Sequence, residues 1–285
     1  IMVSVEMENR VGVVILNYMS WKLTIQCIAD IRQSDKERYY IVIVDNDSPN
    51  QSYEKLYEAY KGDESVICIA ADRNGGYAYG NNIGIRECQN KGIKYAIIMN
   101  NDIIFRENSI NELIATLKNN VNTVVSSPKI FDANGNIGGR QFVGKPTIFQ
   151  FAGLLSQTRL HLDLDNTNCE KKVYSVPCCC IAVDVDKFIA MGAFDEGTFM
   201  YCEEGTMSAQ AWRAGYDIVY NPSAMVVHNH VNVGGKNSYF TEKNMAISAV
   251  YFWNTYMSKS KLETIFLKII FSLRISMKRL LGKLS

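Results

Sequence analysis

Residues 11–18 read VGVVILNY, a continuous apolar and β-branched run that ends abruptly in two polar residues, Asn17 and Tyr18. A run of this kind is typical of a strand that is buried on both faces of a sheet. Residues 21–31 follow with apolar side chains at helical spacing. The first structural unit is therefore predicted to be a strand that leads into a helix.

The same pattern repeats along the first half of the chain. Buried strands that alternate with helices predict an α/β fold with a single Rossmann-like, mostly parallel sheet flanked by helices. The repeats comprise strands at 40–44, 66–70 and 95–99 and helices at about 53–60 and 78–89. Later segments extend the pattern with helices at about 109–119, 186–191 and 204–214 and strands at 123–127, 181–185 and 218–220.

Polar residues stand directly after each of the first four strands. In open α/β sheets ligands bind outside the carboxyl ends of the strands, so this edge is the expected site. The residues concerned are Asn17, Asp45, Asn74, Asn100, Asn101 and Asp102.

Composition restricts the class of protein. The chain has 285 residues, of which 47% are apolar, and this suffices for one main domain with an appendage. Thirty basic residues against 29 acidic ones give a net charge of +1, which argues against nucleic acid as a partner. Three of the eight cysteines are consecutive (178–180) and the others lack C-x-x-C spacing, which favours buried thiols in a reducing cytosol over disulfides or a zinc site.

The two ends of the chain carry further expectations. The first ten residues lack the basic-then-apolar layout of a secretion signal, and no apolar stretch reaches about 18 residues, so we expect no transmembrane helix. From Lys261 onward, apolar residues recur at helical spacing with lysines and arginines interleaved. This pattern predicts a basic amphipathic helix, which either packs on the core or a partner subunit or contacts an anionic membrane surface.

Residues 74–84 read NGGYAYGNNIG, and they follow a strand and open a helix. Glycines such as Gly76 permit close backbone approach, and a helix N-terminus attracts a diphosphate. The spacing matches neither G-x-G-x-x-G nor a P-loop, which weakens the case for a dinucleotide fold or an NTPase. Taken alone, the segment is better explained by a tight turn and close helix packing.

Asp102 lies at the predicted site edge, where a carboxylate can hold a hard cation beside phosphate oxygens, although an aspartate there can also be a simple turn former. His228 and His230, two of the three histidines, follow the strand-like run 224–227. Each alone reads best as a core or surface histidine. On the same sheet edge as Asp102, a mixed carboxylate and imidazole metal site becomes reasonable.

Glu203 and Glu204 follow the aromatic run 199–201 at the predicted start of a helix. A favourable interaction with the helix dipole is sufficient to explain adjacent carboxylates at this position. In a cleft, one of them is suited to accept a proton from an acceptor hydroxyl.

The order of these segments resembles glycosyltransferase family 2, the inverting enzymes of GT-A fold, and especially its bacterial rhamnosyltransferase-like branch. The resemblance covers about residues 10–235. The matching segments are residues 14–18 (VILNY), 42–48 (VIVDNDS), 74–84, 99–102 (MNND), 192–196 (GAFDE), 199–204 (FMYCEE) and 226–228 (VVH).

The resemblance implies a GT-A domain over residues 1–255, with a nucleotide-sugar half at about 10–130 and an acceptor half at about 131–255. The C-terminal amphipathic helix, residues 256–285, would extend it. Within the acceptor half, the irregular, Gly-rich stretch 131–168 would shape the acceptor site.

The resemblance also implies roles for individual residues. Asp45 matches the acidic residue that recognises the pyrimidine or ribose of the donor. Asp102 stands at the end of the family's D-x-D motif as a metal ligand, His228 would complete the metal shell, and Mg²⁺ or Mn²⁺ is the expected cofactor. Glu204 would be the catalytic base. The predicted nucleotide-sugar contacts are Asn17, Asp45, Asn74, Gly76, Asn82, Asn100, Asn101 and Glu203.

Three departures from the family pattern stand out. Glu204 replaces the usual aspartate, and Asn100 and Asn101 leave one carboxylate instead of two in the D-x-D site. Thr206 and Gln210 occupy positions i and i+4 where the family often has Asp and Arg, so both members of a possible ion pair are absent together.

The implied reaction moves a sugar, from dTDP-rhamnose or a UDP-hexose, to a hydroxyl of a glycan or lipid-linked glycan in bacterial surface polysaccharide synthesis. The expected location is cytoplasmic, with possible peripheral contact on the inner face of the cell membrane. A non-catalytic GT-A domain that binds a sugar nucleotide or a partner glycosyltransferase is the alternative. A nucleotidyltransferase ranks below both. It would need a basic phosphate-binding loop after the first strand, and that segment contains only one basic residue, Lys22.

Overall fold

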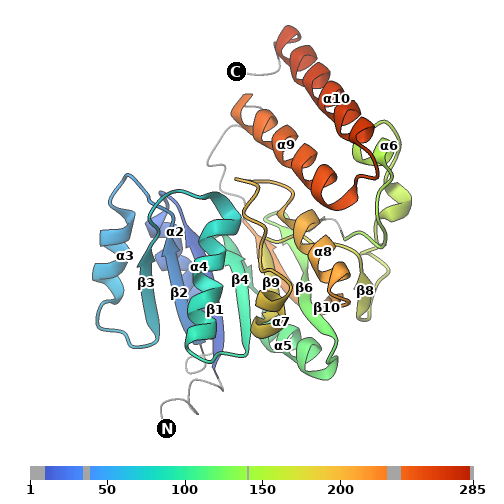
Figure 1. Ribbon diagram of the computed structural model, residues 1–285. Coiled ribbons are helices and arrows are strands. Elements are labelled where there is room, and N and C mark those ends of the chain that lie inside the picture. Colours follow the sequence, from blue (N-terminus) through green and yellow to red (C-terminus); the bar gives the residue numbers. More distant parts are fainter. Residues whose placement is uncertain (1–9, 35–38, 140, 230–238, 283–285) are drawn as a thin grey trace.

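The computed structural model describes residues 10–34, 39–139, 141–229 and 239–282. A central sheet carries helices on both faces, and a pair of C-terminal helices lies at one end (Figure 1). The strands are β1 (Val11–Asn17), β2 (Tyr39–Asp45), β3 (Val66–Ala70), β4 (Tyr95–Asn100), β5 (Ile103–Phe105), β6 (Thr123–Asp132), β7 (Ile137–Gly138), β8 (Lys171–Val173), β9 (Cys180–Asp184) and β10 (Asp217–His228). The helices are α2 (Trp21–Ser34), α3 (Ser52–Tyr60), α4 (Gly76–Asn90), α5 (Ser109–Asn119), α6 (Ile148–Phe151), η1 (Thr158–Leu160), α7 (Val185–Ala190), α8 (Glu203–Arg213), α9 (Tyr239–Phe252), η2 (Trp253–Met257) and α10 (Lys261–Leu280).

The sheet is parallel in its first half and mixed in its second. Its strand order is β3-β2-β1-β4-β9-β6-β10-β5, and β1 pairs in parallel with both β2 and β4. Strand β9 inserts antiparallel between β4 and β6, and β5 pairs antiparallel with β10. The α/β prediction is confirmed, but the sheet is mixed rather than mostly parallel, because β9 and β5 pair antiparallel with their neighbours while β6 and β10 still pair in parallel.

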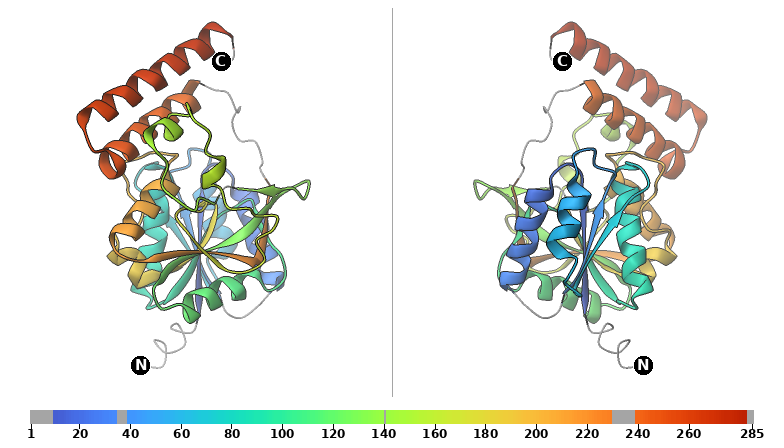
Figure 2. Two further views of the ribbon diagram at one scale, coloured as in Figure 1. Left: turned by 90° about the vertical axis from the view of Figure 1, so that its right-hand side faces the viewer. Right: turned by 90° about the vertical axis from the view of Figure 1, so that its left-hand side faces the viewer.

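Helices cover both faces of the sheet (Figure 2), and an apolar cluster lies between the sheet and the helices on each side. On one face, Val13, Ile15 and their neighbours pack against α2, α3 and α5. On the other face, Val14 and Val42 pack against α4, α7 and α8. Burial on both faces explains why the early strands read as unbroken apolar runs rather than as alternating patterns.

Helix α4 lies unusually close to the sheet. A Cβ atom placed on Gly84 would come within 2.3 Å of Cγ1 of Val14 in β1, which is closer than two carbon atoms can approach. Close packing was one of the two interpretations of the 74–84 segment, and the structure supports it for this end of the helix.

The helices α6, η1, α9 and η2 and the strands β5 and β8 were not predicted from the sequence. The apolar residues of α9, such as Phe240, Ile247 and Phe252, are spread around the helix, so no single-face periodicity marks it. Strand β10 is also longer than the predicted 218–220. Its register shifts between Asn221 and Met225. Because of this irregularity the sequence shows two separate strand-like runs, 218–220 and 224–227, which the structure joins into one strand.

The C-terminal helices join the main body through an apolar cluster and several hydrogen bonds, including those to Asp195. Trp253 and Leu267 pack against Ala152, which follows α6. The hydroxyls of Tyr251 and Tyr256 donate to the Asp195 carboxylate at distances of 3.0 and 2.5 Å. Helix α10 begins at Lys261 as predicted.

No helix in the described part of the chain is both long enough and apolar enough to cross a membrane.

We predict that Gly76→Ala destabilises the fold by at least about 2 kcal/mol, because Gly76 has a φ of +85° and an added Cβ would lie 1.8 Å from the carbonyl oxygen of Phe199. Denaturant unfolding of the variant measures this loss. Gly62→Ala is the matched control, since nothing lies within 4 Å of its added Cβ. Equal stability of the two variants would refute this account of the turn.

Candidate active site

The carboxyl ends of β1 and β2 carry a buried polar pair. Asn17 and Asp45 lie side by side in the sheet register, and Nδ2 of Asn17 donates to Oδ2 of Asp45 at 2.6 Å. Ser48 caps the same carboxylate with its backbone N–H and its hydroxyl, at 2.9 and 2.8 Å. Asp45 is only 2% exposed, so its position is fixed by the protein itself.

The network continues from β1 to the start of α2 and the end of β4. The Thr24 hydroxyl donates to Oδ1 of Asn17 at 2.8 Å. Asn101 donates both of its amide hydrogens, one to Ser20 at 2.8 Å and one to Thr24 at 2.9 Å. The contribution of Asn101 to donor binding is therefore expected to be indirect, through the position of the loop. Asn100, by contrast, is half-buried at the last position of β4.

The loop before α4 is tied to β2 and to the segment that precedes α8. Asn46 donates to Oδ1 of Asn74 at 2.9 Å and to the carbonyl of Gly76 at 3.1 Å. The backbone N–H of Tyr77 donates to the Phe199 carbonyl at 3.1 Å. The predicted residues Asn74 and Gly76 thus lie at the same edge as Asp45 and Asn17.

Asp102 and His228 are brought together from distant parts of the sequence. The antiparallel pairing of β5 with β10 sets His228 opposite Ile103, directly beside Asp102. Nε2 of His228 lies 3.1 Å from Oδ1 of Asp102, and the two side chains are 11% and 14% exposed. Burial alone would lower the pKa of His228, but hydrogen bonds with Asp102 and Cys179 raise it to about 10. His230, the other histidine of this segment, lies outside the described residues.

The Asp102 carboxylate and the His228 imidazole are suited to hold a divalent cation. Two neighbouring ligands of an octahedral ion with bonds of about 2.1 Å are about 3.0 Å apart, which matches the spacing of Oδ1 of Asp102 and Nε2 of His228. The described residues contain no cluster of three or more His, Cys, Asp or Glu side chains suited to a metal. These two residues would therefore provide the protein's share of the shell, with phosphate oxygens and water as the remaining ligands.

The three consecutive cysteines lie between this pair and the glutamates. Cys179 contacts His228, and its carbonyl accepts from the Asn100 backbone N–H at 2.9 Å. The Tyr77 hydroxyl donates to the Cys178 carbonyl at 2.6 Å. Burial raises the pKa of the Cys178 thiol, and the nearby carboxylates of Glu204 and Glu203 raise it further. All eight cysteines of the chain are free, and Cys169 is exposed rather than buried.

The backbone turns sharply just before the two glutamates. Tyr201 and Cys202 have φ angles of 73° and 67°, and two successive non-glycine residues in this region are costly enough to suggest a functional constraint. Helix α8 then begins at Glu203. Glu203 is 7% exposed, and burial together with the Glu204 charge raises its pKa to about 7.

Glu204 lines a pocket. Its side chain reaches solvent there, yet protein surrounds it closely, and this desolvation raises the pKa of Glu204 above the ordinary carboxyl range. The pocket has a volume of about 210 Å³, and four of its lining residues come from the irregular 131–168 stretch. These four are Phe142, Pro146, Phe151 and Gln157, and Tyr174, Ser175 and Phe252 also line the pocket.

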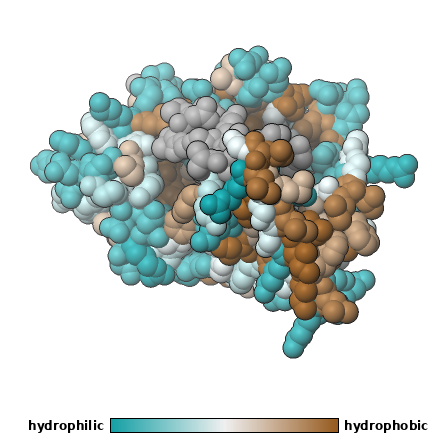
Figure 3. All heavy atoms as spheres, turned by 90° about the horizontal axis from the view of Figure 1, so that it is seen from above, coloured by the Kyte–Doolittle hydropathy of each residue, from teal (hydrophilic) through white to brown (hydrophobic). Residues whose placement is uncertain are grey.

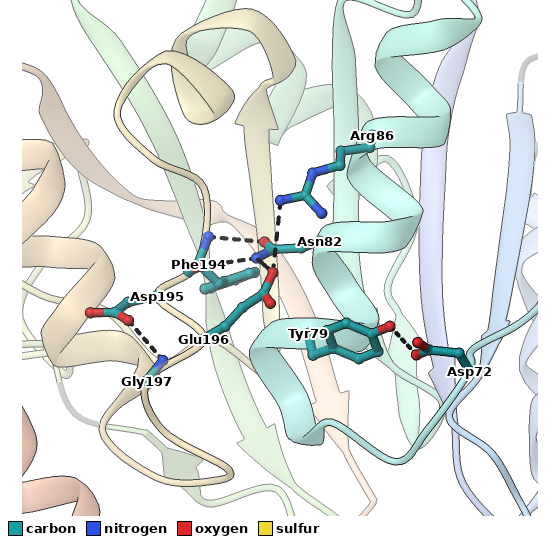
Figure 4. A network of polar contacts seen from close by, with 8 residues as sticks. All are labelled: Asp72, Tyr79, Asn82, Arg86, Phe194, Asp195, Glu196 and Gly197. Carbon is teal, nitrogen blue, oxygen red and sulfur yellow. Dashed lines mark hydrogen bonds and ion pairs between the residues drawn. The ribbon is translucent and has the colours of Figure 1, made fainter.

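Asn82 lies on the side of α4 that faces the 192–197 loop (Figure 4). Its amide group donates to the Phe194 carbonyl at 2.9 Å and to Oε1 of Glu196 at 2.8 Å, and it accepts from the Phe194 backbone N–H at 3.0 Å. Arg86, one turn further along α4, lies 3.7 Å from the same glutamate oxygen. With both amide hydrogens engaged, Asn82 is expected to position this loop rather than to contact the donor.

Several residues that organise the site had no role predicted from the sequence, namely Ser20, Thr24, Asn46, Ser48 and Tyr77. For Asn46 and Ser48 a signal was present, because a polar run such as residues 45–48 typically forms a turn in which side chains cap the backbone. Tyr77 gave no comparable signal, since its partners Cys178 and Phe199 are more than 100 residues away.

Comparisons with known proteins identify the family and the fold of the chain. The family model for glycosyl transferase family 2 matches residues 12–186. A low-salt glycan biosynthesis hexosyltransferase, Agl10 of Haloferax volcanii, is 26% identical over 189 residues, which cover 66% of this chain and 58% of the relative. The chain therefore spans less than two thirds of the length of that relative.

Two solved structures share the fold. GalNAc-T7, crystallised with UDP, GalNAc and Mn²⁺, has a TM-score of 0.63 and 17% identity, covering 94% of this chain and 57% of its own. TarS 1–349 of S. aureus in complex with UDP has a TM-score of 0.57 and 12% identity, covering 93% of this chain and 71% of its own. The sheet with its helical layers is thus a GT-A fold, and the chain belongs to glycosyl transferase family 2.

Proposed function

We propose that the chain is an inverting, metal-dependent glycosyltransferase that moves a sugar from a nucleotide-diphosphate donor to a hydroxyl of a glycan acceptor. The observation that carries this proposal is the position of Glu204 in a pocket walled by the 131–168 stretch, while Cys178 and Cys179 link it to the Asp102 and His228 pair. A carboxylate with a raised pKa in such a pocket is suited to general-base work.

The donor would lie along the carboxyl ends of β1, β2 and β4. Asn74 and Asn100, which are partly exposed, would contact the base and ribose. The buried pair Asn17 and Asp45 would shape this polar edge from within the protein, and Glu203 would lie near the sugar. UDP is the nucleotide bound in the two similar structures, and it is the first to test here. The proposed donors remain dTDP-rhamnose and UDP-hexoses.

Glu204 would accept the proton of the acceptor hydroxyl. The freed oxygen attacks the anomeric carbon opposite the diphosphate, and the bond from that carbon to the diphosphate oxygen breaks, so the configuration inverts. Asp102 and His228 would hold Mg²⁺ or Mn²⁺, which neutralises charge on the departing diphosphate. The aromatic walls of the pocket, among them Phe142, Phe151 and Phe252, would contact the acceptor beside the base.

The acceptor class and location are also part of the proposal. A glycan or lipid-linked glycan of the cell envelope, modified on the cytoplasmic side of the membrane, fits the glycan biosynthesis role of the Haloferax relative. Eight free cysteines are consistent with a reducing compartment.

We predict that Glu204→Gln lowers kcat by about 100-fold or more, because the amide cannot accept the proton, while the Kd for the donor nucleotide changes little. Transfer or donor hydrolysis measures kcat, and calorimetry with UDP measures binding. In the wild type, activity should rise with pH as Glu204 loses its proton, at a pH above the usual carboxyl range.

The neighbouring variant Glu203→Gln serves as the matched control, and it should affect KM for the donor more than kcat. Full activity of the Glu204→Gln variant would remove Glu204 from the role of base. Nucleotide-sugar binding without any turnover in the wild type would instead favour a non-catalytic GT-A domain, the alternative that the altered positions Thr206 and Gln210 suggest.

We further predict that cation affinity rises with pH by roughly tenfold per unit between pH 6 and 9. The raised pKa of His228 means that its imidazole is protonated in this range when no cation is bound, and each cation must displace one proton. Titration of Mn²⁺ in buffers of different ionisation enthalpy counts the protons released. The His228→Gln variant should bind more weakly and lose most of the pH dependence, and equal pH dependence in both proteins would contradict this assignment.

A further inference from the structure

Helix α10 presents apolar side chains on two faces. On the inner face, Leu267 is buried and Phe271 packs beside it in the cluster that includes Val250 of α9 and Ala152 of the main body. The outer face carries a second apolar row, which we call the outer stripe: Leu262, Ile265, Ile269, Leu273, Met277 and Leu280. Each of these residues is more than half exposed, and exposure reaches 87% at Leu280. Seen from above, hydrophobic residues form a band over the C-terminal helices (Figure 3).

A groove with cationic residues runs beside the outer stripe. It lies between α9 and α10 and has a volume of about 480 Å³. Ile247, Val250 and Phe271 give it apolar walls, and Lys243, Lys268 and Arg279 bring positive charge to it.

The acidic residues of these helices are already engaged. Glu242 forms an ion pair with Lys278, and Glu263 accepts from the Trp253 indole at 3.0 Å and from the Lys259 backbone at 3.1 Å. Residues 239–280 contain seven basic residues against these two acidic ones. The region therefore keeps a net positive charge beside its exposed apolar row.

We propose that the outer stripe and the adjoining groove dock the protein on the surface of an anionic lipid bilayer. The stripe enters the boundary between headgroups and acyl chains, and Lys243, Lys268 and Arg279 hold lipid phosphates. An apolar face flanked by lysines and arginines is the arrangement of interfacial helices, whose long basic side chains reach the headgroups from an apolar position. At 20 residues, α10 is about 30 Å long and lies along the surface.

Charge favours a bilayer over a second copy of the chain as the occupant. In a two-fold dimer built on this face, the basic groove of one copy would meet the same basic surface of the other. Like charges at an interface oppose association, whereas an anionic bilayer neutralises them.

The docking face is connected to the pocket of the proposed base. Phe151 and Phe252 line the Glu204 pocket, and their rings are in contact, with centroids 5.5 Å apart. Phe151 also packs on Trp253 and Phe271 of the C-terminal helices. If the proposed function holds, a bilayer on this face brings a lipid-linked acceptor to the end of the molecule where Glu204 lies.

Co-sedimentation of the full chain with vesicles tests the docking directly. The wild type should bind phosphatidylcholine vesicles that contain phosphatidylglycerol and should bind pure phosphatidylcholine at most weakly. Lys243→Glu combined with Lys268→Glu should weaken binding by about 30-fold or more, because each lysine near an anionic surface contributes roughly a factor of five. Ile269→Glu combined with Leu273→Glu should abolish binding through the stripe.

The pair Lys55→Glu and Lys171→Glu is the matched control, since it changes net charge equally at exposed positions far from α9 and α10. This control should bind like the wild type. Equal binding by the Lys243 and Lys268 variant, or none by the wild type, would overturn the proposal, and a concentration-dependent dimer lost in the stripe variant would assign the face to a second copy. Donor hydrolysis, measured without vesicles, should be unchanged in the stripe variant, so failure of docking is separable from failure of the proposed function.

Discussion

The pairing of β10 with β5 is the contact on which the proposed metal site depends. Without it, Asp102 would be a single carboxylate after β4, too little to hold a cation beside phosphate. The antiparallel register sets His228 opposite Ile103, and the imidazole and carboxylate then lie 3.1 Å apart. The sheet edge that carries Asn17 and Asp45 thereby also carries a carboxylate and an imidazole that together can bind a metal ion. The insertion of β9 completes the arrangement, because it carries the preceding cysteines to the same edge.

Two further constraints place the proposed base. The successive left-handed residues Tyr201 and Cys202 turn the chain so that α8 starts with its two glutamates at the pocket. Tyr77 binds the Cys178 carbonyl through its hydroxyl and the Phe199 carbonyl through its backbone, so the start of α4 fixes both segments at once. Donor edge and base are therefore parts of one hydrogen-bonded assembly rather than independent loops.

The sequence predicted the first half of the fold closely because each strand there is buried on both faces and each helix has one apolar side. Strand 66–70 and helix 109–119 coincide with the observed bounds. The second half lacks these regular signals: β5 has three residues, β10 contains a bulge, and the apolar residues of α9 surround the helix. In the site, residue types and order pointed to Asp102, His228 and Glu204. The sequence could not predict which way the Asn82 amide points, because its hydrogen bonds with Phe194 join residues that are 112 positions apart.

The central claim is that a cation held by Asp102 and His228 lies on the same side of the molecule as the Glu204 carboxylate. Anomalous diffraction from crystals grown with Mn²⁺ and UDP tests it most directly. The account predicts one manganese peak bonded to Oδ1 of Asp102 and Nε2 of His228, in contact with the diphosphate, with the Glu204 carboxylate facing the space beyond the β-phosphate. A peak bound to other residues, or a Glu204 side chain directed away from that space, would contradict it.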